Sequence, residues 1–422
     1  MPRSFAQARA AVFALAAVFV FTIAVAAAES AGSPAFLAVD LGTLGGSTSF
    51  ANAVNNSGLV VGDSMIAHDA DSHAFLWTPA GGMVDLGTLG GTFSSAVAVN
   101  KNGQVAGYST TRAGAWHAFS WTQAGGMVDL GAFAGDYSYA TALNNADQVV
   151  GYSTTRDGSP HAFSWTQAGG LVDLGTLGGS RSIATSVNDS GEVVGVANSA
   201  DDAGNHAFSW TQAAGLVDLG TLGGSASGAL AVNTSGLVVG YASTASEDWH
   251  VAYWTPAGAI VDLGGTSQSS AYAVNDSGQI VGSIVRPGDS AMHAFSWTQA
   301  SGLLDLGTFG GSVSIAEAVS ESGQVVGYGN TTGDLASNAF SWTAAGGLIN
   351  LGASSGDSSY AGAVNNAGEV IGWSQTPHGD LHAALWATRL PSTADDCKNN
   401  GWQISGAFKN QGDCVSYVES HS

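Results

Sequence analysis

HAFSWTQAGGMVDLG, residues 117–131, is written eight times along this chain with small changes. Two markers give the same count, at a spacing of 43 to 45 residues, and a fixed period of this length indicates a repeat architecture. The DLG element begins at Asp40, Asp85, Asp129, Asp173, Asp218, Asp262 and Asp305, with Asn350 in the eighth place. The tryptophan of the HAFSW element recurs at Trp77, Trp121, Trp165, Trp210, Trp254, Trp297, Trp342 and Trp386.

Each copy has the pattern of four short strands joined by tight turns. In the second copy the runs 96–100, 104–109, 117–122 and 127–131 alternate in character at a period of two, which is typical of half-buried strands. The turn NKNG between the first two runs ends in Gly103, which can take a positive φ. We therefore expect each unit to be a four-stranded meander.

Four strands in about 44 residues, repeated, are typical of a β-propeller blade. The chain opens with PAFLAVDLG at 34–42, a lone fourth strand, and the repeats end with HAALWATRL at 382–390, a third strand without its fourth. Pairing these fragments would complete one blade and remove exposed sheet edges. We predict an all-β fold, an eight-bladed β-propeller over residues 36–390 that the N-terminal strand closes. A β-solenoid is the alternative, but it leaves the split blade unexplained.

The first strand of each unit carries small residues at every second position. In the first copy these are Ala51, Ala53 and Asn55, and the next copies repeat the pattern. Small side chains suit the crowded strands nearest the axis of a propeller. Larger residues such as Phe119 and Trp121 suit the outer part, where neighbouring sheets pack face to face.

Three elements, HAFSW, DLGTLGG and VNxxGxVVG, recur in fixed order. Together they resemble the HAF repeat, a family of predicted extracellular bacterial repeats, over roughly residues 36–390. HVAYW at 250–254, NAFSW at 338–342 and HAALW at 382–386 depart from the pattern. The family has no assigned activity, so the resemblance implies export and a repeat fold and supplies no catalytic residues.

The N-terminus has the pattern of a secretory signal peptide, residues 1–28. Arg3 and Arg9 precede an apolar run from Ala10 to Val25, and three alanines end at Ala28, the expected cleavage site. The apolar run is short for an uncleaved membrane anchor. We therefore expect a secreted protein, extracellular or periplasmic, whose mature chain has no membrane span.

Net charge and composition restrict the partners. The formal net charge is −22, only 10% of residues are charged, and 60 are glycine. An acidic surface repels nucleic acid, whose phosphates require clustered cations. The many glycines fit short strands and tight turns.

The repeated histidines and tryptophans are predicted to be structural. One histidine per copy is spread around a wide ring, whereas metal ligands must meet within about 2 Å of one ion. We expect each to bond to the DLG aspartate or to a backbone carbonyl, and each tryptophan to lie in the core. The histidines are His73, His117, His161, His206, His250, His293 and His382, and Asn338 takes the place of one. No HExxH motif and no Walker loop is present, and no metal or cofactor is expected.

Function is expected where the repeat symmetry breaks. The linker GTLGGS becomes GAFAGDYSY at 131–139 and GASSGDSSY at 352–360, which brings Asp136 and Asp357 to equivalent places. Trp116 and Trp249 are not part of the repeat motif; each stands just before the repeated histidine of its own copy. These four residues are our candidate binding residues for a cation or for a sugar.

The composition changes after Trp386. Residues 391–396 read as a linker, and residues 397–418 carry the chain's two cysteines, Cys397 and Cys414. In an exported protein an isolated pair is expected to form a disulfide. The segment resembles a short two-cysteine tail found on assorted exported bacterial proteins, which implies a small appended module.

The near-identical copies favour an exported, non-enzymatic binding or scaffold module. Its ligand would be a polysaccharide or another extracellular or envelope protein. The alternative is a propeller enzyme, a glycan lyase or hydrolase, that acts at the central funnel.

Overall fold

The computed structural model describes residues 36–134, 136–200, 204–266, 268–286, 288, 290–353, 356–388, 411–412 and 415–416. The predicted signal peptide (1–28), the predicted linker (391–396) and both cysteines, Cys397 and Cys414, lie outside these residues.

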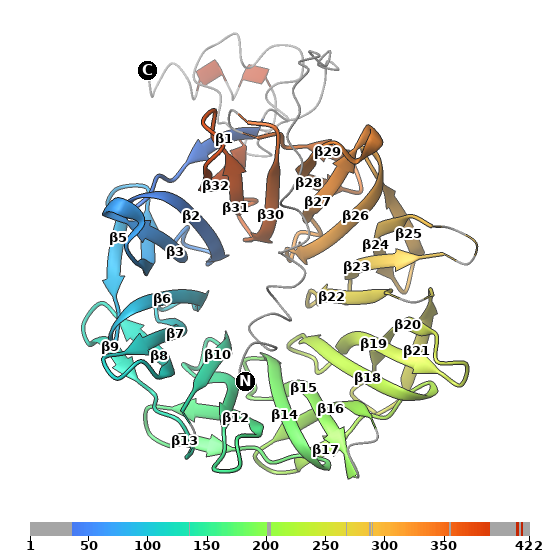
Figure 1. Ribbon diagram of the computed structural model, residues 1–422. Coiled ribbons are helices and arrows are strands. Elements are labelled where there is room, and N and C mark those ends of the chain that lie inside the picture. The colour runs from blue at the N-terminus through green and yellow to red at the C-terminus, as the bar shows by residue number, and fades with distance from the viewer. Residues whose placement is uncertain are drawn as a thin grey trace.

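Four-stranded antiparallel sheets stand around a ring, each with its first strand nearest the centre (Figure 1). These innermost strands contact one another in sequence order around the ring, and β2 contacts β30. This radial arrangement is that of a β-propeller, not of a solenoid. The innermost strands are β2 (Gly45–Val54), β6 (Gly90–Val99), β10 (Ser138–Leu143), β14 (Gly178–Val187), β18 (Gly223–Val232), β22 (Ser270–Val274), β26 (Gly310–Val319) and β30 (Ser359–Val364).

The second and third strands of each sheet follow outward as antiparallel partners. The second strands are β3 (Val60–Ile66), β7 (Val105–Thr111), β11 (Val149–Thr154), β15 (Val193–Ser199), β19 (Val238–Thr244), β23 (Ile280–Val285), β27 (Val325–Thr331) and β31 (Val370–Gln375). The third strands are β4 (Ser72–Thr78), β8 (Trp116–Thr122), β12 (Pro160–Thr166), β16 (Asn205–Thr211), β20 (Trp249–Trp254), β24 (Met292–Thr298), β28 (Ser337–Thr343) and β32 (Leu381–Thr388).

The fourth strands form the outer rim of the ring. They are β5 (Gly82–Gly87), β9 (Gly126–Asp129), β13 (Gly170–Asp173), β17 (Gly215–Asp218), β21 (Ile260–Gly264), β25 (Gly302–Gly307), β29 (Gly347–Asn350) and β1 (Phe36–Asp40). Two 3₁₀ turns, η1 (Ala67–Asp69) and η3 (Thr332–Asp334), connect second and third strands. Among the described residues, a single parallel bridge joins neighbouring sheets at three places: Ser72 with Phe93, Trp116 with Tyr137, and Met292 with Val313.

The predicted meander is confirmed, with one difference at its first strand. Strand β6 begins at Gly90, six residues before the predicted run, because the glycine pair of the linker extends the ladder as far as a pair between Gly90 and Thr111. The register also shifts between Ala96 and Ala98, a β-bulge, so the small residues do not alternate strictly. Strands β10 and β30, which follow the two variant linkers, and β22, which follows GGTSQSS at 264–270, lack the extension and are shorter.

Closure of the ring joins the two ends of the repeat region. Strand β1 pairs antiparallel with β32, with Val39 opposite Leu385 and Asp40 opposite Ala384. The amide of Leu41 adds a hydrogen bond to the carbonyl of Ala383 at 2.9 Å. The predicted completion of the last sheet by the first strand is therefore confirmed.

The core lies between neighbouring sheets. Phe119 of β8, fully buried, packs against Val61, Ala74 and Leu86 of the sheet before it. Equivalent clusters recur around the ring. Apolar burial is therefore divided among successive interfaces, and each interface holds two sheets together.

Two copies exchange one core aromatic for another. In β20 the phenylalanine of HAFSW is replaced by Ala252, and Trp254 is fully buried, with its Nε1 donating to the carbonyl of Leu219 at 2.8 Å. In β32 Ala384 and the fully buried Trp386 repeat the exchange. The remaining repeat tryptophans are half-buried beside their phenylalanines. The prediction of core tryptophans therefore holds in full for these two copies and in part for the others.

Asparagine side chains link the sheets near the centre of the ring. Asn55 donates from Nδ2 to the carbonyl of Asn100 at 2.9 Å, and Asn100 donates to that of Asn144 at 3.2 Å. The series continues as far as Asn275, which donates to the carbonyl of Ser320, and Asn365 donates to the carbonyl of Asn55 at 3.0 Å. The predicted turn asparagines thus bind both their own turn and the next sheet.

The turns divide the ring into two ends. Turns between first and second strands, such as 100–103, and between third and fourth strands, such as 123–126, lie at one end, here called the hairpin face. The linkers between sheets and the turns between second and third strands, such as 112–115, lie at the other end, here called the linker face. In the part of the chain that the structure describes, no helix is long and apolar enough to cross a membrane.

Candidate functional site

The repeated histidines form one pair per sheet with the DLG aspartates. Nδ1 of His117 lies 2.8 Å from a carboxylate oxygen of Asp129, and the carboxylate also accepts the amide of Gly131 at 2.7 Å. This confirms the predicted bond between the two elements. The same pair recurs for His73, His161, His206, His250, His293 and His382 with Asp85, Asp173, Asp218, Asp262, Asp305 and Asp40. These histidines hold a third strand to a fourth strand.

Asp136 and Asp357 do not form one site. Both are exposed, on the linkers that precede β10 and β30. Strand β10 has β6 and β14 as its inner neighbours, whereas β30 has β2 and β26, so the two linkers belong to sheets that are not adjacent. Within the described ranges, no cluster of three or more His, Cys, Asp or Glu residues could hold a metal ion.

Trp116 and Trp249 lie in different sheets and different surroundings. Trp249, 40% exposed, stacks on Tyr241 with the ring centroids 4.7 Å apart. Trp116 is half-buried and contacts aromatic rings from two sheets. Of the four predicted residues, Trp116 alone lies within an extended aromatic surface.

That surface, here called the aromatic cluster, joins the β6–β9 and β10–β13 sheets near the linker face. It consists of Phe93, Tyr108, Trp116, Tyr137, Tyr139 and Tyr152, with centroids of contacting rings 5.1 to 6.2 Å apart. Trp116 and Tyr137 are also joined by a parallel bridge. All but Tyr152 keep part of their surface exposed, so the cluster presents a rigid aromatic wall.

Two phenols of this wall are neutral at physiological pH. Burial raises the pKa of Tyr139 to about 12, with smaller contributions from Tyr108 and Tyr137. Burial also raises the pKa of Tyr152, more than the nearby positive charge of Arg181 lowers it. Tyr139 and Tyr152 are therefore uncharged, and an arginine borders the cluster on β14.

A polar group borders the opposite side of the cluster. Asp63 of β3 occupies the position that Tyr108 has in the next sheet. Its carboxylate accepts from Ser95 at 2.8 Å and from Asn52 at 3.2 Å. Burial raises the pKa of this carboxyl group. Asp63 thus connects the β2–β5 sheet to β6, beside Phe93.

Sequence reasoning found Trp116 but missed the rest of the cluster. Its members occupy different positions of the repeat, so no single motif contains them. The sequence analysis also overlooked GASSG at 352–356, which matches the G-x-S-x-G pattern of serine hydrolases. That pattern requires a turn from a strand into a helix, whereas this segment connects two strands, β29 and β30, and Ser354 lies outside the described residues.

Several solved structures with a similar fold are peptidases. Dipeptidyl peptidase 4 of Porphyromonas gingivalis has a TM-score of 0.54 at 10% identity, over 87% of this chain and 62% of that one. The β-propeller domain of the trilobed protease of Pyrococcus furiosus has a TM-score of 0.44 at 9% identity, over 72% and 97%. Acylaminoacyl peptidase of Pyrococcus horikoshii has a TM-score of 0.42 at 8% identity, over 73% and 53%.

No protein-family model matches this sequence, and a comparison with curated proteins finds no match. The structural likeness at this identity shows the fold alone. The chain spans 62% of the length of the dipeptidyl peptidase.

These neighbours correct the functional prediction. The sequence favoured a non-enzymatic binding or scaffold module for a polysaccharide or an envelope protein, with a glycan lyase or hydrolase as the alternative. The likeness to dipeptidyl peptidase 4 corrects that prediction, because the similar propeller belongs to a peptidase and not to a polysaccharide-binding or scaffold protein. The functional prediction relied on the near-identical repeats. These repeats determine how the ring is built and carry no information about the ligand.

Proposed function

We propose that this chain is an eight-bladed propeller of the peptidase type, which receives peptide substrates at the aromatic cluster. The blade count is supported by the eight copies of each repeat marker and by the pairing of β1 with β32, which joins the first and last fragments. In this proposal the bond-cleaving step belongs to a further catalytic domain or chain.

The aromatic cluster is the observation that carries the proposal. Its rings come from β6, β7, β8, β10, β11 and, for Tyr137, the linker before β10, and the sheets hold the strand residues in place before any ligand arrives. Rigid aromatic faces bind the apolar, aromatic and proline side chains of a peptide and stack on its planar amides. The phenols of Tyr139 and Tyr152 are uncharged, so they do not repel the peptide carbonyls.

The asymmetry of the ring supports a peptide site on one side. At the level of Phe93 and Tyr137, the equivalent residues are Thr48, Arg181, Ala226, Gln268, Val313 and Ser358, none of which is aromatic. A smaller aromatic group, Tyr328, Tyr360 and Trp373, lies farther around the ring. A ligand would therefore find its largest aromatic surface at the aromatic cluster. A peptide can lie along such a surface without filling a closed cavity.

The test is a binding measurement with a fluorescent peptide library on the purified chain. The triple variant Phe93→Val, Tyr108→Ser, Trp116→Met installs the residues found at the equivalent positions Val313, Ser283 and Met292. Since the repeats already accommodate these residues, the variant should fold. We expect apolar and aromatic peptides to bind the wild-type chain with a micromolar Kd. Their affinity for the triple variant should be at least tenfold lower.

The matched control changes a stacked pair outside the cluster, Trp249→Met with Tyr241→Ser, which should leave peptide affinity unchanged. Equal affinity of wild type and triple variant would remove the cluster from the proposal. Binding of no peptide above background would overturn the proposed function itself.

The resemblance to HAF repeats and export through the segment 1–28 stay predictions that accompany this proposal. Both predictions place the protein outside the cytoplasm, where it would act on extracellular or periplasmic peptides. N-terminal sequencing of the protein from culture medium or periplasm checks the export step. We expect the mature chain to begin at Glu29.

A further inference from the structure

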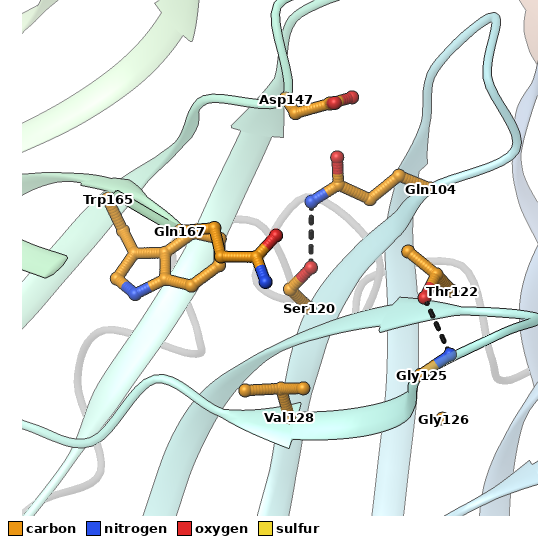
Figure 2. Close-up of a pocket in the computed structure, with 9 residues that line it drawn as sticks. All are labelled: Gln104, Ser120, Thr122, Gly125, Gly126, Val128, Asp147, Trp165 and Gln167. Atoms are coloured by element: carbon orange, nitrogen blue, oxygen red, sulfur yellow. Dashed lines mark hydrogen bonds between the residues drawn. The ribbon is translucent and has the colours of Figure 1, made fainter. Parts of the chain in front are cut away.

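A second site lies at the hairpin face, away from the aromatic cluster. A pocket of about 170 Å³ opens between the β6–β9 and β10–β13 sheets (Figure 2). Gln104, Ser120, Thr122, Gly125, Gly126 and Val128 line it from one sheet, and Asp147, Trp165 and Gln167 from the other. Figure 2 shows Asp147 above the pocket and the indole of Trp165 at its side.

Asp147 breaks the symmetry of the turns. It has φ +64°, in the left-handed region that favours glycine. The seven equivalent residues are Gly58, Gly103, Gly191, Gly236, Gly278, Gly323 and Gly368, all with positive φ. An aspartate at this place is less favourable than glycine for the turn, so its presence points to a role for its carboxylate.

The carboxylate of Asp147 has neutral partners. Its Oδ1 accepts from Nδ2 of Asn100 at 2.7 Å and from Nδ2 of Asn102 at 3.3 Å. Within the described residues, Oδ2 accepts no hydrogen bond and Asp147 forms no ion pair. The pocket therefore carries a negative charge that the surrounding protein does not neutralise.

The other walls suit an organic cation. The half-buried indole of Trp165 offers an aromatic ring, and cations are attracted to the faces of such rings. Val128, 47% exposed, gives apolar contact for an alkyl stem. Gln104 is held by its bond to Ser120 at 2.7 Å. We propose that this pocket binds a small alkylammonium group, with Asp147 as counter-charge and Trp165 as aromatic wall.

The repeat supplies an internal copy of the site without its charge. One sheet farther along, the equivalent lining residues are Gln148, Ser164, Thr166, Gly169, Gly170, Val172, Trp210 and Gln212, with Gly191 in place of Asp147. Gly191 has φ +85°, and a Cβ added there would meet only the side-chain oxygen of Gln148, at 3.3 Å. Gly191→Asp should therefore create a second site.

The experiment titrates n-butylammonium into the purified chain at low salt, by calorimetry and ligand-observed NMR, with neutral 1-pentanol as the matched probe. We expect one site for n-butylammonium and at least tenfold weaker binding of 1-pentanol. Asp147→Gly should abolish the binding while the Tm stays the same or rises. Asp147→Asn keeps the side-chain size and should also abolish it.

Gly191→Asp should raise the stoichiometry from one to two. Binding that survives in Asp147→Gly, equal affinity for 1-pentanol, or no binding by wild type would each overturn the proposal. A folded Gly191→Asp variant with one site would also count against it, since the lining residues are the same. Because the pocket and the aromatic cluster lie at opposite ends of the ring, failure here leaves the peptide proposal standing.

Discussion

His382 and Asp40 are 342 positions apart in the sequence, yet Nδ1 of the imidazole lies 2.8 Å from a carboxylate oxygen. The same pair within a sheet, such as His161 with Asp173, spans only 12 positions. At the closure, the contact ties the first strand of the ring to the last sheet. Because no turn connects β1 to β32, this contact helps to hold β1 against the last sheet.

The first prediction concerns this closure. Asp40→Asn should lower the free energy of unfolding by about 0.5–1 kcal/mol, since the pair is partly exposed. The double variant Asp40→Asn, His382→Asn should recover part of the loss, because Asn338 and Asn350 form such a pair at 3.1 Å in the β26–β29 sheet. Urea unfolding measures both.

Hydrogen exchange distinguishes the closure from an internal pair. The amides of Leu41 and Leu174 make equivalent bonds of 2.9 Å, to Ala383 and Ala162. In Asp40→Asn the amide of Leu41 should exchange markedly faster, whereas Asp173→Asn should change that of Leu174 less. Equal acceleration at both amides would mean that the closing strand is held as firmly as an internal one.

The second prediction concerns the exchanged core aromatics. Trp254→Ala should cost about 3–5 kcal/mol, because the indole is fully buried where Ala252 leaves space, and its bond to Leu219 is lost. Trp210→Ala should cost clearly less, since Phe208 already fills the equivalent core. Urea unfolding of both variants is the measurement. Similar losses would show that the two tryptophans contribute alike.

Period and turn chemistry predicted the fold well. The DLG and tryptophan series located every sheet, and the split PAFLAVDLG and HAALWATRL fragments predicted the pairing of β1 with β32. The start of β6 was missed because Gly90 and Gly91 read as a turn. The ladder extends to these glycines because of contacts with Thr110 and Thr111 on the next strand. The local sequence around Gly90 does not predict such contacts.

The candidate sites were predicted less well, for a reason of geometry. The aromatic cluster forms only when two sheets pack, so Phe93 and Tyr139, 46 positions apart, show no joint signal along the chain. Asp147 could have been found from the sequence, because an alignment of the eight turns between first and second strands shows glycine at this position in the other seven copies. Asp63 could have been found too, since most of its equivalents are aromatic, among them Tyr108, Tyr152 and Tyr241. Comparison of the copies position by position finds such residues, whereas a search for known motifs does not.

The third prediction concerns the glycine of the repeated VVG element. A Cβ on Gly151 would lie 1.9 Å from the carbonyl oxygen of Tyr139, so the inner strand would have to move. Gly151→Ala should destabilise the protein by about 3 kcal/mol or more and displace Tyr139 from the aromatic cluster. In the control Gly158→Ala, the added Cβ meets no neighbouring atom, and the φ of +85° is the source of strain. This variant should lower the free energy of unfolding by roughly 1–2 kcal/mol. Unfolding and peptide affinity are the two readouts.

The fourth prediction concerns Asp63 and pH. Burial raises the pKa of Asp63 in the folded protein above its usual 3.8, so folding is favoured while the group is protonated. That contribution is complete below about pH 3.8 and is lost as the pH rises through the folded pKa. Asp63→Asn should therefore be more stable than wild type at pH 7 and about equal to it near pH 3.5.

The geometry allows this substitution. The amide oxygen of an asparagine can accept from Ser95 and Asn52, as Oδ1 now does, and its nitrogen can donate to Ser72, whose hydroxyl lies 3.5 Å from Oδ2.

Asp157→Asn is the control of opposite sign. A hydrogen bond from Thr155 lowers the pKa of Asp157, so its contribution is present at neutral pH and lost as the pH falls. Urea midpoints from about pH 3.5 to 7.5 should thus diverge toward neutral pH in opposite directions for the two variants. A fall in stability of Asp63→Asn at pH 7 would mean that its hydrogen bonds to Asn52 and Ser95 outweigh the cost of burying the charge.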